Sequence, residues 1–291
     1  MQILIAIALL GGLGLIFGLV LAAASKVFYV ETDPRLDKLN ECLPGANCGG
    51  CGYAGCGAYA EAVLNGEAPI GACASGGNEC AQAMAAIMGV KAEAVTRKVA
   101  LVRCSGAKSY DKDGNLVKGA KVKANYEGFH DCLAASKVGG SGPLSCKYGC
   151  LGYGSCTKAC KYGAIKVVDG VAVVDEDLCV GCMACAAVCP RNLIVPVEPD
   201  RNVVIACNSM AKGAATTRAC TVGCIGCGLC KKICPEGAIT IENNVARIDY
   251  SKCTQCGLCA TVCPKKLIKD VNAGHHDDNN VVSINGPAIK A

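Results

Sequence analysis

The sequence from Cys220 to Pro264 reads CTVGCIGCGLCKKICP and, after a spacer, CTQCGLCATVCP. Both parts contain C-x2-C-x2-C-x3-C-P, starting at Cys224 and at Cys253. Thiolates at this spacing bind [4Fe–4S] clusters, and the fourth cysteine of each run binds the other cluster. A zinc site needs two C-x2-C pairs and has no use for the third close cysteine. The stretch therefore predicts two clusters, bound by Cys224, Cys227, Cys230 and Cys263 and by Cys234, Cys253, Cys256 and Cys259.

The pair of cysteine runs has an upstream copy at a constant offset of 74 residues. For example, Cys150 of the upstream copy corresponds to Cys224. The segments GAIKVVDGVAVVD at 163–175 and GAITIENNVARID at 237–249 correspond at this offset. Each predicts a β-hairpin, with Asp-Gly or Asn-Asn at its turn. We therefore expect an α+β fold with two tandem ferredoxin-like modules, at 91–200 and 201–268.

The repeat is broken at one ligand position, because Tyr153 stands where the second module has Cys227. Cys146 lies four residues before Cys150 and is the substitute that we expect. The alternative is a three-ligand or lost cluster. The first module is then predicted to bind its clusters through Cys146, Cys150, Cys156 and Cys189 and through Cys160, Cys179, Cys182 and Cys185.

Two strand-like segments, 99–104 and 203–207, each end in a cysteine. These two and two others, namely Cys104, Cys132, Cys207 and Cys220, belong to no motif. They are either four ligands of a further cluster at the junction of the repeats, or buried thiols or redox-active pairs. The sequence leaves both alternatives open.

Residues 46–90 predict a small helical domain with a fifth [4Fe–4S] site. Cys48, Cys51, Cys56 and Cys73 have the spacing C-x2-C-x4-C-x16-C, and neighbouring glycines let the backbone close around a bulky ligand. A zinc knuckle is the alternative. Apolar periodicity predicts a helix after Cys56 and a second helix over 77–89. Cys42 and Cys80 are left over, and Cys80 is expected to be a buried free thiol. The prediction is thus five clusters, with a sixth open.

Residues 1–25 contain no charged side chain. A helix of this length spans the hydrocarbon core of a bilayer, so we predict a transmembrane anchor. A signal peptide is the alternative, but there is no basic n-region. Lys26, Arg35 and Lys38 follow the segment and predict that the bulk of the chain is cytoplasmic. Residues 26–45 are predicted to be a linker, and 269–291 a mobile tail.

Composition excludes several classes of function. The chain has 26 cysteines among 291 residues, three Phe and no Trp. A disulfide scaffold disagrees with the cysteine spacing, and cluster insertion requires a reducing compartment. The net charge of +5 comes without a basic stripe interleaved with aromatic residues, so nucleic acid is not a predicted partner. No dinucleotide-binding glycine motif is present, so the chain has no complete catalytic site of its own.

The segment LPGANCGGCGYAGC at 43–56, placed between an apolar helix and ferredoxin-like modules, resembles the corresponding segment in the B subunits of Rnf complexes. The duplicated cluster region is similar to the longer, clostridial-type form. The resemblance implies a component of a membrane-bound ferredoxin:NAD⁺ oxidoreductase that translocates Na⁺ or H⁺. It implies reduced ferredoxin as donor, a flavin- and NAD-binding C subunit and membrane subunits as partners, and the inner cell membrane as location.

Two other classes of protein compete with this interpretation. One is a polyferredoxin of another membrane oxidoreductase, such as a hydrogenase-type system. The other is a zinc-ribbon scaffold, which predicts a colourless protein. Lysines near the clusters are expected to attract an acidic donor. These are Lys158, Lys161, Lys231, Lys232, Lys265 and Lys266.

Overall fold

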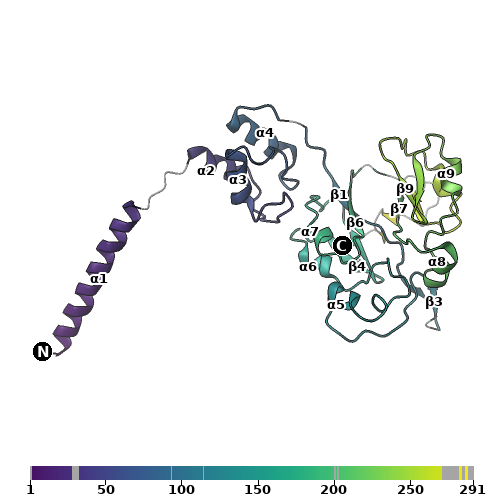
Figure 1. The fold of residues 1–291 in the computed structure, drawn as a ribbon, viewed down its shortest axis with the longest axis horizontal. Helices are drawn as coiled ribbons and strands as arrows, with labels where there is room; N and C mark the ends of the chain where they lie inside the picture. The colour runs from purple at the N-terminus through teal and green to yellow at the C-terminus, as the bar shows by residue number, and fades with distance from the viewer. Residues whose placement is uncertain are drawn as a thin grey trace.

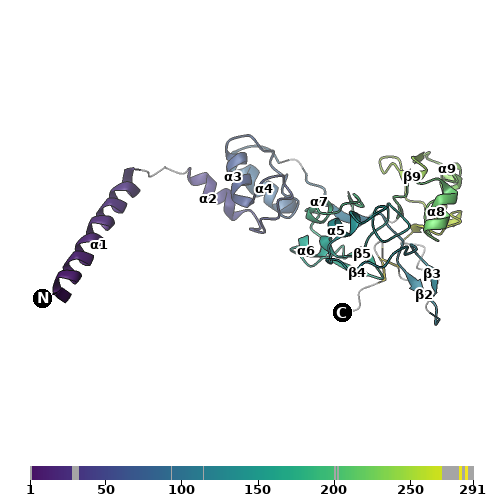
Figure 2. The same ribbon diagram turned by 60° about the horizontal axis from the view of Figure 1, so that its bottom comes forward.

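The computed structural model describes residues 2–27, 33–92, 94–113, 115–199, 201, 203–270, 282–283 and 286–287. Figure 1 shows a helical domain built from α2 to α4, followed along the long axis by the two modules. The view in Figure 2 shows the same sequence of parts from another side. The cysteine-rich parts of the chain therefore form a row.

The first helix, α1 (Gln2–Val27), carries one charged residue, Lys26. Its side chains are described from Leu10 onward, and large apolar ones such as Leu13 and Phe17 are exposed. Within the described residues, no helix combines the length and the apolar character needed to cross a membrane. The predicted transmembrane segment falls on α1.

The helical domain consists of α2 (Pro34–Glu41), α3 (Cys56–Leu64) and α4 (Gly77–Met88). Leu39 of α2, Tyr59 of α3 and Met84 of α4 are fully buried in one core. The side chain of Asp33 caps α2 by accepting a hydrogen bond from the Arg35 N–H. Both helices predicted after Cys56 are therefore confirmed. The segment 26–45, predicted to be a linker, instead contributes α2 to this core.

Each module has the same pattern of two antiparallel strand pairs. In the first, β1 (Val99–Val102) pairs with β6 (Ile194–Val197), and β4 (Ile165–Val168) forms a hairpin with β5 (Val171–Val174). In the second, the pairs are β7 (Val203–Ile205) with β10 (Ile268–Asp270), and β8 (Ile239–Glu242) with β9 (Val245–Ile248). Both hairpins turn where the sequence predicts, which supports the α+β class.

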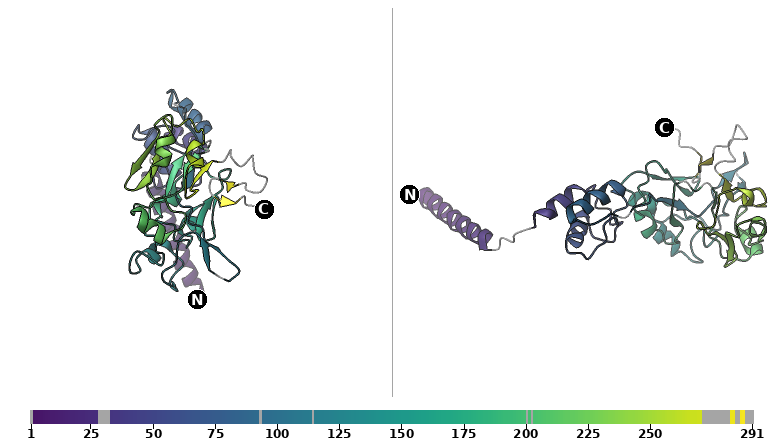
Figure 3. Two further views of the ribbon diagram at one scale, coloured as in Figure 1. Left: turned by 90° about the vertical axis from the view of Figure 1, so that its right-hand side faces the viewer. Right: turned by 90° about the horizontal axis from the view of Figure 1, so that it is seen from above.

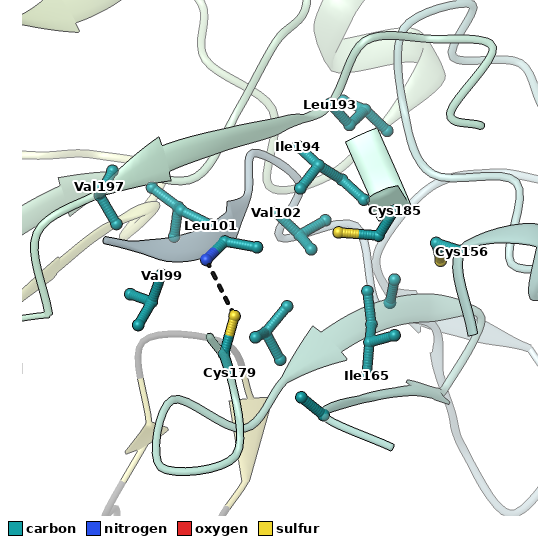
Figure 4. Packing of buried hydrophobic residues seen from close by; sticks show 14 of the residues in the cluster. Val99, Leu101, Val102, Cys156, Ile165, Cys179, Cys185, Leu193, Ile194 and Val197 are labelled. Atoms are coloured by element: carbon teal, nitrogen blue, oxygen red, sulfur yellow. Dashed lines mark hydrogen bonds between the residues drawn. The ribbon is translucent and has the colours of Figure 1, made fainter. Parts of the chain in front are cut away.

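Four short helices each bring one cysteine into a module core. They are α6 (Ser155–Ala159), α7 (Ala184–Ala187), α9 (Leu229–Ile233) and α10 (Leu258–Thr261). The cysteine side chains replace part of the missing aromatic core. Figure 4 shows the sulfur atoms of Cys156, Cys179 and Cys185 among the apolar side chains of the first module. The Ala100 N–H of β1 donates a hydrogen bond to Cys179 Sγ at 3.4 Å.

The modules differ in the segment that precedes their first motif. The first module has β2 (Ser109–Tyr110), β3 (Leu116–Lys118) and α5 (Cys132–Ser136) there, whereas the second has only α8 (Gly213–Ala219). The longer insertion contacts the second module through an isolated bridge between Ala120 and Cys220. The Ser105 N–H also donates to the Ala206 carbonyl at 2.9 Å. The two modules are thus joined by backbone hydrogen bonds.

The C-terminal part contains one further strand pair, β11 (Val282–Ser283) with β12 (Gly286–Pro287). Figure 3 shows this pair beside the modules. Most of the tail predicted to be mobile lies outside the described residues.

Candidate iron–sulfur centres

Five cavities of 330 to 370 Å³ lie along the helical domain and the two modules. Four of them are each lined by four cysteines, and the cavity of the helical domain is lined by four cysteines of its own together with Cys182 of the first module. An all-thiol lining suits a [4Fe–4S] cluster, because each of its four irons takes one cysteine thiolate. Within the described residues, no three or more His, Cys, Asp or Glu side chains form a group that could hold a metal ion.

In the second module, both sets of cysteines are those predicted from the motifs. One cavity is lined by Cys224, Cys227, Cys230 and Cys263, and the other by Cys234, Cys253, Cys256 and Cys259. The fourth cysteine of each run therefore crosses to the other cavity. Gly226 of the first motif packs closely against the turn between β8 and β9. Its φ is +66°, and a Cβ there would lie 2.9 Å from the Asn244 carbonyl oxygen, so this approach requires glycine.

In the first module, one cavity has the predicted set, Cys160, Cys179, Cys182 and Cys185. The other differs from the prediction. It is lined by Cys150, Cys156, Cys189 and Cys132, while Cys146 is not among its lining residues. The motif spacing predicts Cys146 here and leaves the role of Cys132 open, whereas the structure has Cys132 in the lining in place of Cys146.

Local hydrogen bonds explain the position of Cys132. Asp131 caps α5 by accepting from the Ala134 N–H, and its carboxylate also accepts from the Ser155 hydroxyl at 2.8 Å. The Ser155 hydroxyl in turn accepts from the Cys132 N–H at 2.7 Å. Because Ser155 opens α6, these bonds fix the start of α5 beside the motif. No pattern in the sequence signals this contact, since Cys132 lies 18 residues before Cys150.

In the helical domain, Cys48, Cys51, Cys56 and Cys73 line one cavity, as predicted. The Asn47 side chain accepts from the Cys56 N–H at 2.8 Å and so positions the start of α3. The leftover Cys80 is buried in α4, as predicted. Hydrogen bonding from its thiol lowers the pKa of Cys73 to about 6, and the same contact raises the pKa of Cys80.

The helical domain meets the first module beside two of these cavities. The Lys161 ammonium donates to the carbonyls of Ala46 and Asn47, both at 2.8 Å. A Cβ at Gly50 would lie 2.5 Å from the Cys182 carbonyl oxygen, so only glycine permits this approach. Cys182 also lines the cavity of the helical domain. The cavities on either side of this contact are therefore neighbours.

Burial decides the protonation of the bare thiols in the module cores. It raises the pKa of Cys156 and of Cys185 to about 12, and that of Cys259 to about 11. These thiols therefore keep their protons at neutral pH. Iron binds the thiolate, so cluster insertion must release protons.

The lysines predicted to attract a donor are in different environments. Lys161 is held at the domain contact, Lys158 donates to the His130 carbonyl at 3.0 Å, and Lys265 donates to the Thr221 carbonyl at 3.2 Å. Lys231, Lys232 and Lys266 are exposed on the second module. Cys227 and Cys256 of this module are exposed as well. The second module thus carries three exposed lysines and two exposed cysteines, while Glu236 also lines one of its cavities.

Comparisons with known proteins agree with these sites. Residues 43–75 match a family model for a putative Fe-S cluster, residues 172–195 a 4Fe-4S binding domain, and residues 223–267 a 4Fe-4S dicluster domain. Cys132 lies outside all three matched segments.

Curated relatives match most of the chain. The B subunit of the Na⁺-translocating ferredoxin:NAD⁺ oxidoreductase complex of Acetobacterium woodii is 45% identical over 86% of this chain and 73% of the relative. Its proton-translocating counterpart in Clostridium ljungdahlii is 43% identical over 83% and 82%. The B subunit of an ion-translocating oxidoreductase complex of Methanosarcina acetivorans is 39% identical over 85% and 90%. With this identity and coverage, the chain belongs to the family of B subunits of ion-translocating ferredoxin:NAD⁺ oxidoreductase complexes, the Rnf complexes.

Proposed function

We propose that this chain is the electron-relay component of a membrane-bound ferredoxin:NAD⁺ oxidoreductase coupled to Na⁺ or H⁺ translocation. The observation that carries the proposal is the row of five four-cysteine cavities. A [4Fe–4S] cluster in each supplies one-electron transfer at low potential. The chain accepts electrons from reduced ferredoxin and passes them to partner subunits, including the flavin- and NAD-binding C subunit and the membrane subunits.

The ligand sets follow from the cavities, with Cys132 in place of Cys146 in the first module. Contacts between residues of neighbouring sets give the order of the sites. Cys48 shares the Ser75 hydroxyl with Tyr162, whose neighbour Cys160 lines the next cavity. Thiols of the two sets within a module also interact, as Cys156 does with Cys185 and Cys230 with Cys259. The row therefore runs from the second module through the first to the helical domain.

Ferredoxin docks at the second module. This end carries the exposed Cys227 and Cys256 and the exposed Lys231 and Lys232. The opposite end of the row is the cavity inside the helical domain, where none of the four cysteines of the set is exposed. Positive charge beside an exposed site raises the association rate of an acidic partner.

The helix α1 anchors the chain in the membrane. The support for this anchor comes from the sequence, because residues 1–25 carry no charged side chain and a helix of that length can span the ~30 Å hydrocarbon core of a bilayer. Gly14 and Gly18 lie one turn apart, and a Cβ at either would meet nothing within 4 Å. That leaves room for a neighbouring membrane helix. Lys26 and the basic residues after it support a cytoplasmic location of the cysteine-rich domains, because positive residues that flank a membrane helix favour the cytoplasmic side.

The docking proposal is tested by charge reversal. The variant Lys231→Glu/Lys232→Glu is expected to lower the rate of reduction by ferredoxin about tenfold at low salt, and less at high salt. The matched control is Lys112→Glu/Lys118→Glu on the β2–β3 hairpin, where the lysines are also exposed. Stopped-flow absorbance of the full chain measures the rate. Equal rates for both double variants would refute docking at this end.

The reaction class is tested in the assembled complex. Membranes that contain the complex should reduce NAD⁺ with reduced ferredoxin, and deletion of this chain should abolish that activity. Ferredoxin oxidation that yields hydrogen and leaves NAD⁺ unchanged would instead assign the chain to a hydrogenase-type system.

A further inference from the structure

Four cysteines outside the five cavities come together where the two modules meet. Cys104 follows β1, Cys146 precedes the first motif, Cys207 follows β7 and Cys220 ends α8. A Cβ at Gly149 would lie 3.4 Å from Cys146 Sγ and 3.7 Å from Cys104 Sγ, so these two sulfurs flank the same glycine.

The pairs from the two modules face each other. Cys146 and Cys220 are buried in the same core, together with Ala120 and Leu144. Burial raises the pKa of the Cys220 thiol to about 11, and the nearby Cys146 and Cys207 thiols add to the rise; burial likewise raises the pKa of Cys104, with a contribution from Cys207. Each module therefore contributes two of four neighbouring thiols.

The backbone around two of these sulfurs is arranged in the same way in both modules. Cys104 Sγ accepts from the N–H of Gly106 at 3.4 Å and of Cys150 at 3.3 Å. Cys207 Sγ accepts from the N–H of Ser209 at 3.5 Å and of Cys224 at 3.3 Å. A thiol sulfur is a weak acceptor, whereas a thiolate is a strong one. Burial raises the pKa of both thiols, and the two N–H donors at each sulfur lower it again in part, so they reduce the cost of forming the thiolate that iron binds.

Cationic side chains surround the same place. The Arg191 guanidinium donates to the Cys146 carbonyl at 2.9 Å, and Arg247 donates to the Cys207 carbonyl at 3.1 Å. Lys265, which corresponds to Arg191 at the 74-residue offset, donates to the Thr221 carbonyl beside Cys220. Four thiolates around a cluster leave a net negative charge, and a buried charge requires such compensation.

We propose that Cys104, Cys146, Cys207 and Cys220 bind a sixth [4Fe–4S] cluster, to which each module supplies two ligands. The inference deepens the proposed relay and rests on its cluster content. Cys150 and Cys224, whose N–H groups contact this set, are themselves ligands of the flanking sites. The sixth site therefore lies between the modules and connects their inner clusters. It also gives a role to Cys220, which lines neither cavity of the second module.

The test counts clusters in the full chain, assembled anaerobically with ⁵⁷Fe. The wild type is expected to hold six clusters, or about 24 irons. Cys146→Ala, Cys220→Ala and the double variant should each lose the same single cluster, which leaves about 20 irons. Cys42→Ala is the matched control and should keep all six, because Cys42 lines none of the five cavities. Mössbauer spectroscopy counts the intact clusters.

The outcomes separate this inference from the proposed function. Three outcomes overturn the sixth site without contradicting the proposed relay. They are a wild type with five clusters, a double variant that loses two clusters, and a disulfide or zinc at these cysteines. A chain without iron overturns the relay itself. Where the variants fail to fold, an anomalous map of the wild type at the iron edge decides. An iron peak between Cys146 and Cys220 supports the site, and none there refutes it.

Discussion

Cys132 lines the same cavity as Cys150, whereas Cys146 does not. Double variants can test whether the clusters follow this arrangement. If two cysteines bind the same cluster, removing both destroys no more clusters than removing one. If they bind different clusters, the losses add. We expect Cys132→Ala/Cys150→Ala to lose one cluster and Cys146→Ala/Cys150→Ala to lose two.

The expected size follows from the cavity. Cys132 is one of four thiols around a space of about 370 Å³, so its loss leaves three ligands and removes one intact cluster. Alanine at this position retains the backbone N–H that donates to Ser155, and the Asp131 cap of α5 is untouched. The module should therefore keep its fold while the cluster count changes.

Mössbauer spectra of ⁵⁷Fe-loaded full-length variants give the number of intact [4Fe–4S] clusters. This readout is preferred to total iron, because a site with three thiolates can retain a partial cluster. The single variants Cys132→Ala, Cys146→Ala and Cys150→Ala are the references for each pair. The reasoning would be refuted if Cys146→Ala/Cys150→Ala lost one cluster and Cys132→Ala/Cys150→Ala lost two, the result expected from motif spacing alone.

Three further predictions concern the domain contact, Cys80 and pH. The variant Gly50→Val places a Cβ that would overlap the Cys182 carbonyl, and it should slow electron transfer to the helical domain without loss of iron. Rapid-freeze EPR measures the rate of this transfer. Gly139→Ala is the control, because nothing lies within 4 Å of its Cβ. Cys80→Ala removes a hydrogen bond to Cys73 and should lower the reduction potential of that cluster, since the bond stabilises negative charge; an unchanged potential in a redox titration would contradict this. Because burial raises the pKa of Cys156 to about 12, the cluster-free chain should lose stability between pH 9 and about pH 12, where only unfolded thiols ionise. Chemical denaturation across this range measures the loss, and a constant free energy of unfolding would oppose it.

Much of this architecture could be predicted from local sequence. The C-x2-C-x2-C-x3-C-P runs predict which cysteines meet, since three ligands are close in sequence and the fourth follows a fixed crossing rule. The hairpins β4–β5 and β8–β9 follow from a turn between two apolar runs. These features depend on residues less than about 40 positions apart, and over such distances the spacing in the sequence determines which cysteines can bind the same cluster.

The structure departs from prediction where a contact depends on the insertion in the first module. Cys146 is nearer to Cys150 in sequence than Cys132 is, and spacing therefore favours it. The hydrogen bonds among Asp131, Ser155 and the start of α5 bring Cys132 to the site instead. The contact of Cys132 thus depends on tertiary packing, which motif spacing does not encode. The burial of Leu39 is a different case, because Leu36, Leu39 and Leu43 recur at helical spacing and this apolar periodicity predicts the buried face of α2.

We propose that this chain receives electrons from ferredoxin and carries them through iron–sulfur clusters. The most direct test is to mix the isolated, cluster-loaded chain with reduced ferredoxin and to record EPR spectra over time. We predict that signals of reduced [4Fe–4S] clusters appear first from the second module and then from the first module and the helical domain. Variants lacking one cluster each assign the signals. A chain that contains its iron but stays oxidised in the presence of reduced ferredoxin would contradict the account.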